Sequence, residues 1–287
     1  MDLKALREIP PWEWPEEADI MLLEILTNDQ AAADRVVAAE LAASITVIND
    51  ELVDALLSIA QRSDQSEELR RKAAISLGPV LELADTDGFE DPDDVPISED
   101  AFHNIEESLR RLYMDGAVSK NVRRSVLEAS VRAPRDWHQD AVRVAYSSDD
   151  EDWRITAVFS MRWIHGFNNE ILEALESENQ DIHYEAVCAA GNWAVDAAWP
   201  HVLELVASPD TDKFLMLAAI DALATIRPQE AEEILLDLTD SDDQDIVEAA
   251  HEAMTMAQGL LGYEDDGFDD FDEGGEFEEN DGNGYVH

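Results

Sequence analysis

The sequence predicts an all-α protein: an α-solenoid of about six or seven stacked helical hairpins, followed by a disordered acidic C-terminal tail. Two observations predict this fold. Several segments return an apolar or small residue every four positions, which places those residues on one face of a helix. From Val122 onward these segments begin 31, 29, 32 and 32 residues apart, a spacing too regular for unrelated helices. The segments are Leu69, Ala73, Leu77; Val122, Val126, Ser130; Trp153, Ala157, Met161; Ile182, Ala186, Ala190; Phe214, Ala218, Ala222; and Ile246, Ala250, Met254.

Each of these segments follows another amphipathic stretch and a short polar turn. The preceding stretches include residues 51–60, 138–145 and 202–206. The turns, such as 177–180 and 208–211, are rich in Ser, Asp and Asn, which cap a following helix by accepting its free N–H groups. The repeating unit is therefore a helical hairpin of roughly thirty residues.

The chain divides into three parts. Residues 1–16 include the run Pro10-Pro11-Trp12-Glu13-Trp14-Pro15, which cannot be helical throughout and is predicted to pack its tryptophans over the first repeat as a cap. Residues 17–261 form the repeats, the first being 17–45. Residues 262–287 contain 11 acidic side chains and too little apolar surface to offset the entropy of ordering, so we predict a disordered tail.

One irregularity interrupts the repeats. The gap of 53 residues between Leu69 and Val122 is wider than the others and contains the sequence DTDGFEDPDDVPI at residues 85–97. Gly and Pro punctuate this stretch, and the preceding Gly78-Pro79 is expected to bend or end its helix. We predict an acidic insertion loop at 85–97.

The charge of the chain is strongly acidic and uneven. The formal net charge is −48, of which −30 falls in residues 163–287, and Arg227 is the last basic residue. A protein that binds nucleic acid needs a basic face to neutralise phosphates, and a protein that binds an anionic membrane surface needs a basic face as well. We therefore predict neither function. Only four lysines accompany 67 acidic residues, which is also the composition expected in a salt-adapted cytoplasm.

The chain lacks the signals of secretion and of membrane insertion. Cys188 is the only cysteine, which permits no internal disulfide, and no apolar run approaches the ~20 residues of a membrane helix. The N-terminus lacks the apolar core of a signal peptide. We therefore predict a cytoplasmic protein. We also predict a monomer, because the Trp/Pro segment and the acidic C-terminus are both expected to prevent the terminal repeats from stacking on another copy.

Three segments carry an acidic, an apolar and a basic residue followed by a spaced Ala. They are Glu68-Leu69-Arg70 with Ala73 and Ala74, Asp152-Trp153-Arg154 with Ala157, and Asp181-Ile182-His183 with Ala186. This pattern resembles the HEAT repeat, in the short HEAT-like (PBS-lyase-type) form of bacterial and archaeal proteins. Later copies depart from it, with Leu215 and Val247 at the basic position. The resemblance implies an α-solenoid whose second helices line a concave surface.

Two sets of residues are candidates for contact with a partner. The first is a basic ladder at equivalent repeat positions, Arg70, Arg123 and Arg154, continued by His183. One interpretation is a groove for an acidic ligand; the one we favour is structural, with Asp152 or Asp181 of adjacent repeats as partners. The second set is Arg162, Trp163 and Trp193 near the ends of second helices. For these tryptophans, packing and partner contact both remain open.

The sequence shows no catalytic motif. It contains no GxSxG elbow, Walker loop, GxGxxG or CxxC, and Cys188 sits in an apolar segment with nothing to lower its pKa. The HEAT-like di-iron hydroxylase that modifies a lysine-derived side chain draws its metal ligands from several His-Glu pairs, whereas this chain has only His251-Glu252. We therefore predict no enzyme activity, no cofactor and no metal.

The resulting functional prediction is a noncatalytic scaffold or adaptor. Its concave face would bind a protein or peptide partner, and the acidic C-terminal third could attract a basic one. The alternative is a HEAT-like enzyme, or a chromophore or enzyme-maturation factor of the lyase-like type, which rests on analogy alone.

Overall fold

The computed structural model describes residues 3–28, 32–91 and 94–265, and these residues are all-helical, with no strand among them. Seven helical hairpins follow one another, which confirms the predicted fold class. The hairpins are α2 (Ala18–Thr27) with α3 (Ala32–Leu41), α4 (Asp50–Gln61) with α5 (Glu67–Ile75), α7 (Glu99–Met114) with α8 (Lys120–Ser130), α9 (Asp136–Tyr146) with α10 (Glu151–Ser160), α11 (Asn168–Leu175) with α12 (Gln180–Asn192), α13 (Trp199–Ala207) with α14 (Lys213–Ile226), and α15 (Pro228–Leu238) with α16 (Gln244–Asp265).

The polar turns start several second helices as the sequence suggests. The side chains that accept a backbone N–H at these helix starts are Ser66 at α5, Ser119 at α8, Asn179 at α12 and Asp212 at α14. Such caps satisfy donors that the first turn of a helix leaves unpaired. α16 continues to Asp265, beyond residue 261 where the repeats were predicted to end, and the rest of the predicted tail, 266–287, lies outside the described residues.

The N-terminal segment contributes the short helix α1 (Leu3–Arg7) and the 3₁₀ helix η1 (Pro11–Glu13). Leu6 is fully buried, and the indole N–H of Trp14 donates to the carbonyl of Leu6 at 3.0 Å. Trp12, by contrast, is 78% exposed. Within this segment, Trp14 is therefore the tryptophan that packs.

The insertion between α5 and α7 is larger than the acidic loop predicted at 85–97. It begins with an additional helix, α6 (Gly78–Asp87), which packs against α8. A side chain at Gly78 would place its Cβ 2.8 Å from Cδ of Arg132 and 3.4 Å from Cα of Ala129 in α8, so the arginine side chain would have to shift to make room for it. Pro79 lies in the first turn of α6, where its missing N–H costs nothing.

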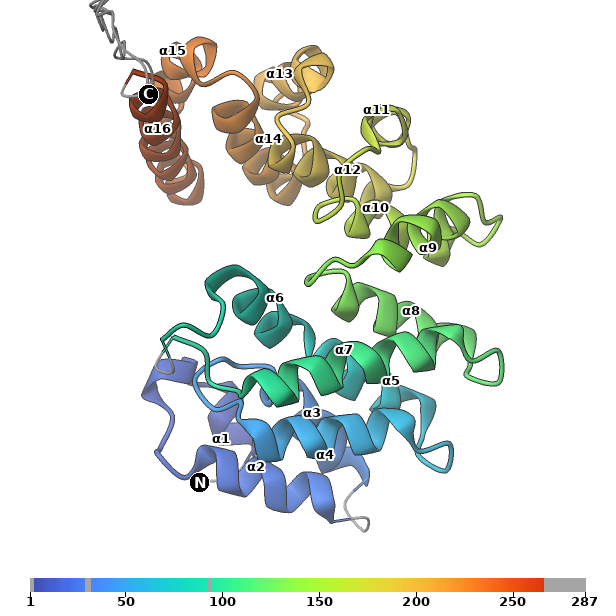
Figure 1. Ribbon diagram of the computed structural model, residues 1–287. Helices are drawn as coiled ribbons and strands as arrows, with labels where there is room; N and C mark the ends of the chain where they lie inside the picture. The colour runs from blue at the N-terminus through green and yellow to red at the C-terminus, as the bar shows by residue number, and fades with distance from the viewer. Residues whose placement is uncertain (1–2, 29–31, 92–93, 266–287) are drawn as a thin grey trace, which may run out of the picture.

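The hairpins stack into a curved body whose inner layer is formed by second helices. Each second helix packs on the next along the whole series from α3 to α16, whereas the first helices pack on each other closely only from α2 through α4 to α7. Spreading the outer layer while keeping the inner one continuous bends the stack, and Figure 1 shows the resulting C shape, with α6 inside the curve.

Small residues allow the close contact between second helices. Gly191 of α12 lies so near α14 that a Cβ would fall 3.0 Å from Cα of Ala222. The buried residues form a nearly continuous apolar cluster from Leu6 to Ala257, as expected when each repeat buries its apolar face against its neighbours. No described helix is long and apolar enough to cross a bilayer.

Candidate functional site

Three arginines hold the first hairpins together from the inside. Each is the fourth residue of its second helix and donates its Nε–H, at 2.9 Å, to a carbonyl in the last turn of the first helix of the same hairpin. The pairs are Arg35 with Leu26, Arg70 with Ala60 and Arg123 with Tyr113. A cation is favoured at this negative end of a helix.

These contacts bear on the favoured structural interpretation of the basic ladder. Arg70 is only 8% exposed, and the partner of its Nε is a backbone carbonyl, where the sequence had suggested an acidic residue of an adjacent repeat. Asp152 instead forms an ion pair with Arg124 at 2.9 Å. Because the Nε–H groups of Arg70 and Arg123 are used within their own hairpins, we leave both residues out of the candidate surface.

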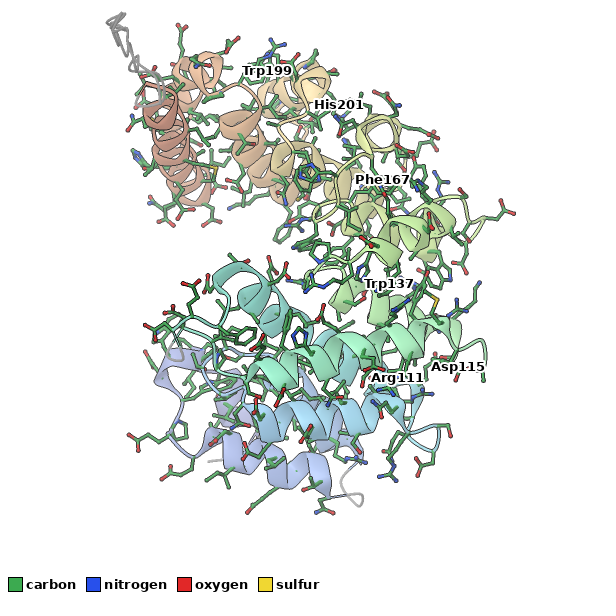
Figure 2. All side chains as sticks on the ribbon, viewed as in Figure 1. Arg111, Asp115, Trp137, Phe167, Trp199 and His201 are labelled. Carbon is green, nitrogen blue, oxygen red and sulfur yellow. The ribbon has the colours of Figure 1, made fainter. Side chains whose placement is uncertain are left out.

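Later residues at the same position make different contacts. The guanidinium of Arg154 lies 5.8 Å from the ring centre of Tyr146. His201 lies near the start of α13 (Figure 2). Its Nε2 is 2.7 Å from Nε2 of His183, so one imidazole donates and the other accepts. Burial, and then the imidazole of His201, hold the pKa of His183 below its usual value.

Arg162 and Trp163 belong to one cation–π cluster at the end of α10. The indole of Trp163 lies 5.1 Å from the guanidinium of Arg162 and 4.9 Å from that of Arg132. Glu82 of α6 completes the cluster: its carboxylate accepts from the indole N–H of Trp163 at 3.3 Å and from Arg132 at 2.5 Å. The α6 insertion is thereby tied to the middle of the solenoid.

Trp193 joins adjacent hairpins. Its indole N–H donates to the carbonyl of Met161 at 2.6 Å, and its ring centre lies 3.6 Å from that of His165. The ring is half-buried, so its contacts within the chain are those of packing. Nearby, burial raises the pKa of the Cys188 thiol, which keeps it in its unreactive protonated form.

A hollow of ≈ 480 Å³ opens on the inner face between α12, α14 and α16; we call it the inner hollow. Three of its lining side chains are large, apolar and exposed: Tyr184 of α12 (36%), Phe214 of α14 (76%) and Met256 of α16 (43%). Each comes from a different second helix. Asp221 and Glu252 contribute carboxylates to the same lining.

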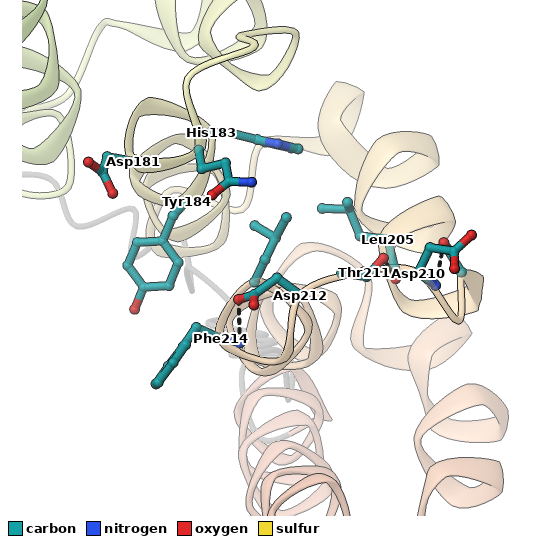
Figure 3. A pocket seen from close by; sticks show the side chains of 11 residues that line it. Asp181, His183, Tyr184, Leu205, Asp210, Thr211, Asp212 and Phe214 are labelled. Carbon is teal, nitrogen blue, oxygen red and sulfur yellow. Dashed lines mark hydrogen bonds between the residues drawn. The ribbon is translucent and has the colours of Figure 1, made fainter.

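The pair Tyr184 and Phe214 also borders a second hollow of ≈ 620 Å³, which extends toward Leu205 and the turn before α14. Figure 3 shows both rings at its edge, together with Asp210 and Asp212 from that turn. The two aromatic side chains therefore stand between two depressions and present apolar surface to both.

Carboxylates near the inner hollow are held in an unfavourable setting. Partial burial, and then the negative charge of Glu252, raise the pKa of Asp221. Burial also raises the pKa of Glu185, although Arg162, 3.4 Å away, opposes this effect. In both cases the charged form is less stable than it would be in water.

Sequence reasoning missed Phe214 as a surface residue because of an error of register. Phe214 was aligned with buried residues such as Ile182, the third residue of α12, but it is the second residue of α14. The third residue of α14, equivalent to Ile182, is Leu215. The fourth residue, which is arginine in the earlier repeats, is therefore Met216 and not Leu215. One residue rotates a helical position by about 100°, which turns Phe214 out of the core. The cap at Asp212 is the signal that fixes the register.

The same region carries no compact set of metal ligands. Across 3–28, 32–91 and 94–265, no three His, Cys, Asp or Glu residues are grouped as ligands of one ion would be. The pair His251-Glu252 lies on the exposed side of α16, and Glu252 faces the inner hollow.

Comparison with known proteins gives a family match and likenesses to solved structures. Residues 168–255 match the family model for HEAT repeats. No curated protein matches the chain in sequence. Among solved structures, human deoxyhypusine hydroxylase in complex with glycerol is similar, with 16% identity over 90% of this chain and 96% of that chain, and a TM-score of 0.38.

This comparison corrects one prediction. The inference that the chain is not an enzyme is contradicted, because the similar solved structure is that of an enzyme, and a solenoid of such hairpins is therefore no ground for excluding catalysis. With a TM-score of 0.38, the likeness assigns no activity to this chain. The predicted family resemblance itself is confirmed: residues 168–255 match the model of the HEAT repeats, and the described residues form an α-solenoid of helical hairpins.

Proposed function

We propose that the chain binds a protein or peptide partner on its inner face, over the inner hollow between α12, α14 and α16. The observation that carries this proposal is the convergence of Tyr184, Phe214 and Met256 on one depression. Single exposed apolar side chains are ordinary on a protein surface, but several gathered around a hollow with a polar rim are typical of an interaction site.

The chemistry of these three side chains suits contact with a polypeptide. Tyr and Phe rings bury much apolar area when covered by a partner, and tyrosine in particular is enriched among the residues that dominate interface energies. The thioether of Met256 is flexible and adapts to partner shape. A partner segment that spans the two hollows would cover both faces of the Tyr184 and Phe214 pair.

The helices that present these residues form a preorganised platform. α12 packs on α14 and α14 on α16 along their lengths, and Gly191 brings the first pair into close contact. Side chains held on packed helices lose less freedom on binding than side chains on loops, which favours affinity.

The test uses matched baits of the full chain in native lysate. The double variant Phe214→Ser/Met256→Ser removes apolar surface from the inner hollow. The control is Leu236→Ser, because Leu236 is 56% exposed on α15 and does not line the hollow. Wild type and control should retain the same stoichiometric partner, and the double variant should lose it while keeping its helical circular dichroism.

The proposal fails if the double variant recovers the same partners as wild type in the same amounts. It also fails if the Leu236 control loses them equally, because binding would then depend on general surface apolarity rather than on the inner hollow.

A further inference from the structure

The charge around the inner hollow narrows the class of partner, and this step rests on the function proposed above. We infer that the partner segment is basic and presents a Lys or Arg beside an apolar residue, the cation meeting Asp221 and Glu252 and the apolar side chain meeting Phe214 and Met256.

The first support is that the acidic side chains of the hollow lack basic counterparts. In the described part of the chain, neither Asp221 nor Glu252 forms an ion pair with Lys or Arg. The basic residue that lines the hollow is Arg162, and its guanidinium already faces Glu185 at 3.4 Å and the ring of Trp163. The two carboxylates are thus left for an incoming cation.

The second support comes from the surrounding repeats. Residues 168–255 contain 21 Asp and Glu against two basic side chains, Lys213 and Arg227. Both are engaged: Lys213 with Asp243 at 2.8 Å and with Asp245, and Arg227 with Asp196 at 2.7 Å. The field over the inner hollow is therefore negative, which speeds the approach of a basic partner and repels an acidic one.

The third support is the disposition of apolar and charged groups within the hollow. Asp221 lies on α14, seven residues and about two turns beyond Phe214, and Glu252 lies one turn before Met256 on α16. Each helix thus offers an apolar anchor and a carboxylate on the side that lines the hollow. A segment that carries a basic residue close to an apolar one can pair with a carboxylate and cover an apolar side chain at once, whereas a purely apolar segment leaves the carboxylates covered and unpaired, at a cost.

The contrast with the middle of the solenoid explains why the basic cluster there is not the competing choice. Arg132 and the indole of Trp163 already meet a carboxylate of the chain itself, Glu82. Among the described residues no Lys or Arg plays this part for Asp221 or Glu252, so both exposed carboxylates remain open to a cation from another molecule.

The experiment is selection from a random-peptide display library on the immobilised full-length chain at about 0.15 M KCl, where the Debye length is about 8 Å and distant charges are screened. Four targets are used in parallel: wild type, Asp221→Asn/Glu252→Gln, Phe214→Ser/Met256→Ser, and Glu232→Gln/Glu233→Gln. The last is the matched control, because it removes two exposed carboxylates of α15 outside the hollow.

Peptides enriched on wild type should carry Lys or Arg near a large apolar residue. The best of them, made as a labelled peptide, should bind Asp221→Asn/Glu252→Gln about tenfold or more weakly, because its cation loses both carboxylate partners, and should bind the α15 control within about twofold. Helical circular dichroism checks that each variant is folded.

The alternative outcomes separate the two proposals. Peptides that depend on Phe214 and Met256 but are neutral or acidic, or bind Asp221→Asn/Glu252→Gln unchanged, overturn the basic partner and leave the proposed function standing. Equal weakening by the α15 control reduces the effect to general attraction by an acidic protein and also overturns it. If no selected peptide depends on Phe214 and Met256, the proposed function itself fails.

Discussion

The first four hairpins and the last three share the same helical architecture, but their charged side chains make different contacts. In the first four, the fourth residue of each second helix is arginine, and three of these arginines bond back to the preceding helix. In the last three, that position holds His183, Met216 and Val247. The stabilising arginine is replaced by a weaker donor and then by none.

The difference teaches where a repeat protein can place a binding surface. In the first four hairpins and the segment that follows α8, arginines such as Arg70, Arg124 and Arg132 are engaged inside the chain, by a backbone carbonyl or by the carboxylates of Asp152 and Glu82. The last three hairpins hold an excess of acid and expose apolar side chains on the inner face. Hydrogen bonds and ion pairs within the chain hold the first hairpins together. Carboxylates and apolar side chains without such partners leave a surface that another molecule can bind.

The largest expected effect is a loss of stability when Arg70 is removed, compared with removal of His183 at the equivalent position of α12. Arg70→Ala removes a buried hydrogen bond to Ala60 and leaves a cavity, so it should lower the free energy of unfolding by about 3 kcal/mol. His183→Ala, at the same position of α12, should cost less than about 1 kcal/mol. Urea unfolding followed by circular dichroism measures both. Equal losses would show that the two regions do not differ in this respect.

A second effect, about 2 kcal/mol, concerns pH and arises in the first four hairpins. His138 is buried, accepts the N–H of Arg135 at Nδ1 and bonds Ser130 at Nε2; its pKa falls from 6.5 to about 4, chiefly because burial disfavours the charged ring. The unfolded chain takes up this proton near pH 6.5, so stability is full above that pH and is lost as the pH falls toward 4. Between pH 7 and pH 5 the loss should be about 2 kcal/mol.

The variant that isolates this effect is His138→Gln, which should flatten the fall in unfolding free energy between pH 7 and pH 5. His103→Gln, on the exposed side of α7, is the matched control and removes a histidine without touching a buried one. A slope that survives in the His138 variant would assign the acid sensitivity to other groups.

Much of the fold could be predicted because burial is periodic. Four-residue steps mark the face of a second helix that packs on its neighbours, and these faces persist even where the basic residue is lost. The extra helix α6 was hidden because Gly78-Pro79 reads as a stop, whereas proline in a first turn equally begins a helix.

The candidate site could not be predicted in the same way. The partner of Arg70 is a carbonyl, which every residue carries and no sequence pattern marks. The convergence of Tyr184, Phe214 and Met256 depends on which helices are neighbours and on how each is rotated, and an error of one residue at Phe214 placed it in the core. Spacing alone does not settle rotation to that accuracy.

The smallest effect tests the unpaired acid of the last three hairpins. Asp221→Asn keeps the shape of the side chain and removes a charge whose pKa is raised by partial burial and by Glu252. A raised pKa means that the ionised form costs stability above that pKa, and that the cost disappears as the pH falls and the carboxyl is protonated in the folded state. The variant should therefore be more stable than wild type at pH 7, by no more than about 0.5 kcal/mol for so exposed a group, and indistinguishable from it below about pH 3, where the carboxyl is protonated in the folded and the unfolded chain. Glu233→Gln, on the outside of α15, should show a smaller gain. If Asp221→Asn is instead destabilising at pH 7, the carboxylate has a stabilising partner within the chain, and the inner hollow is not a site that waits for a cation.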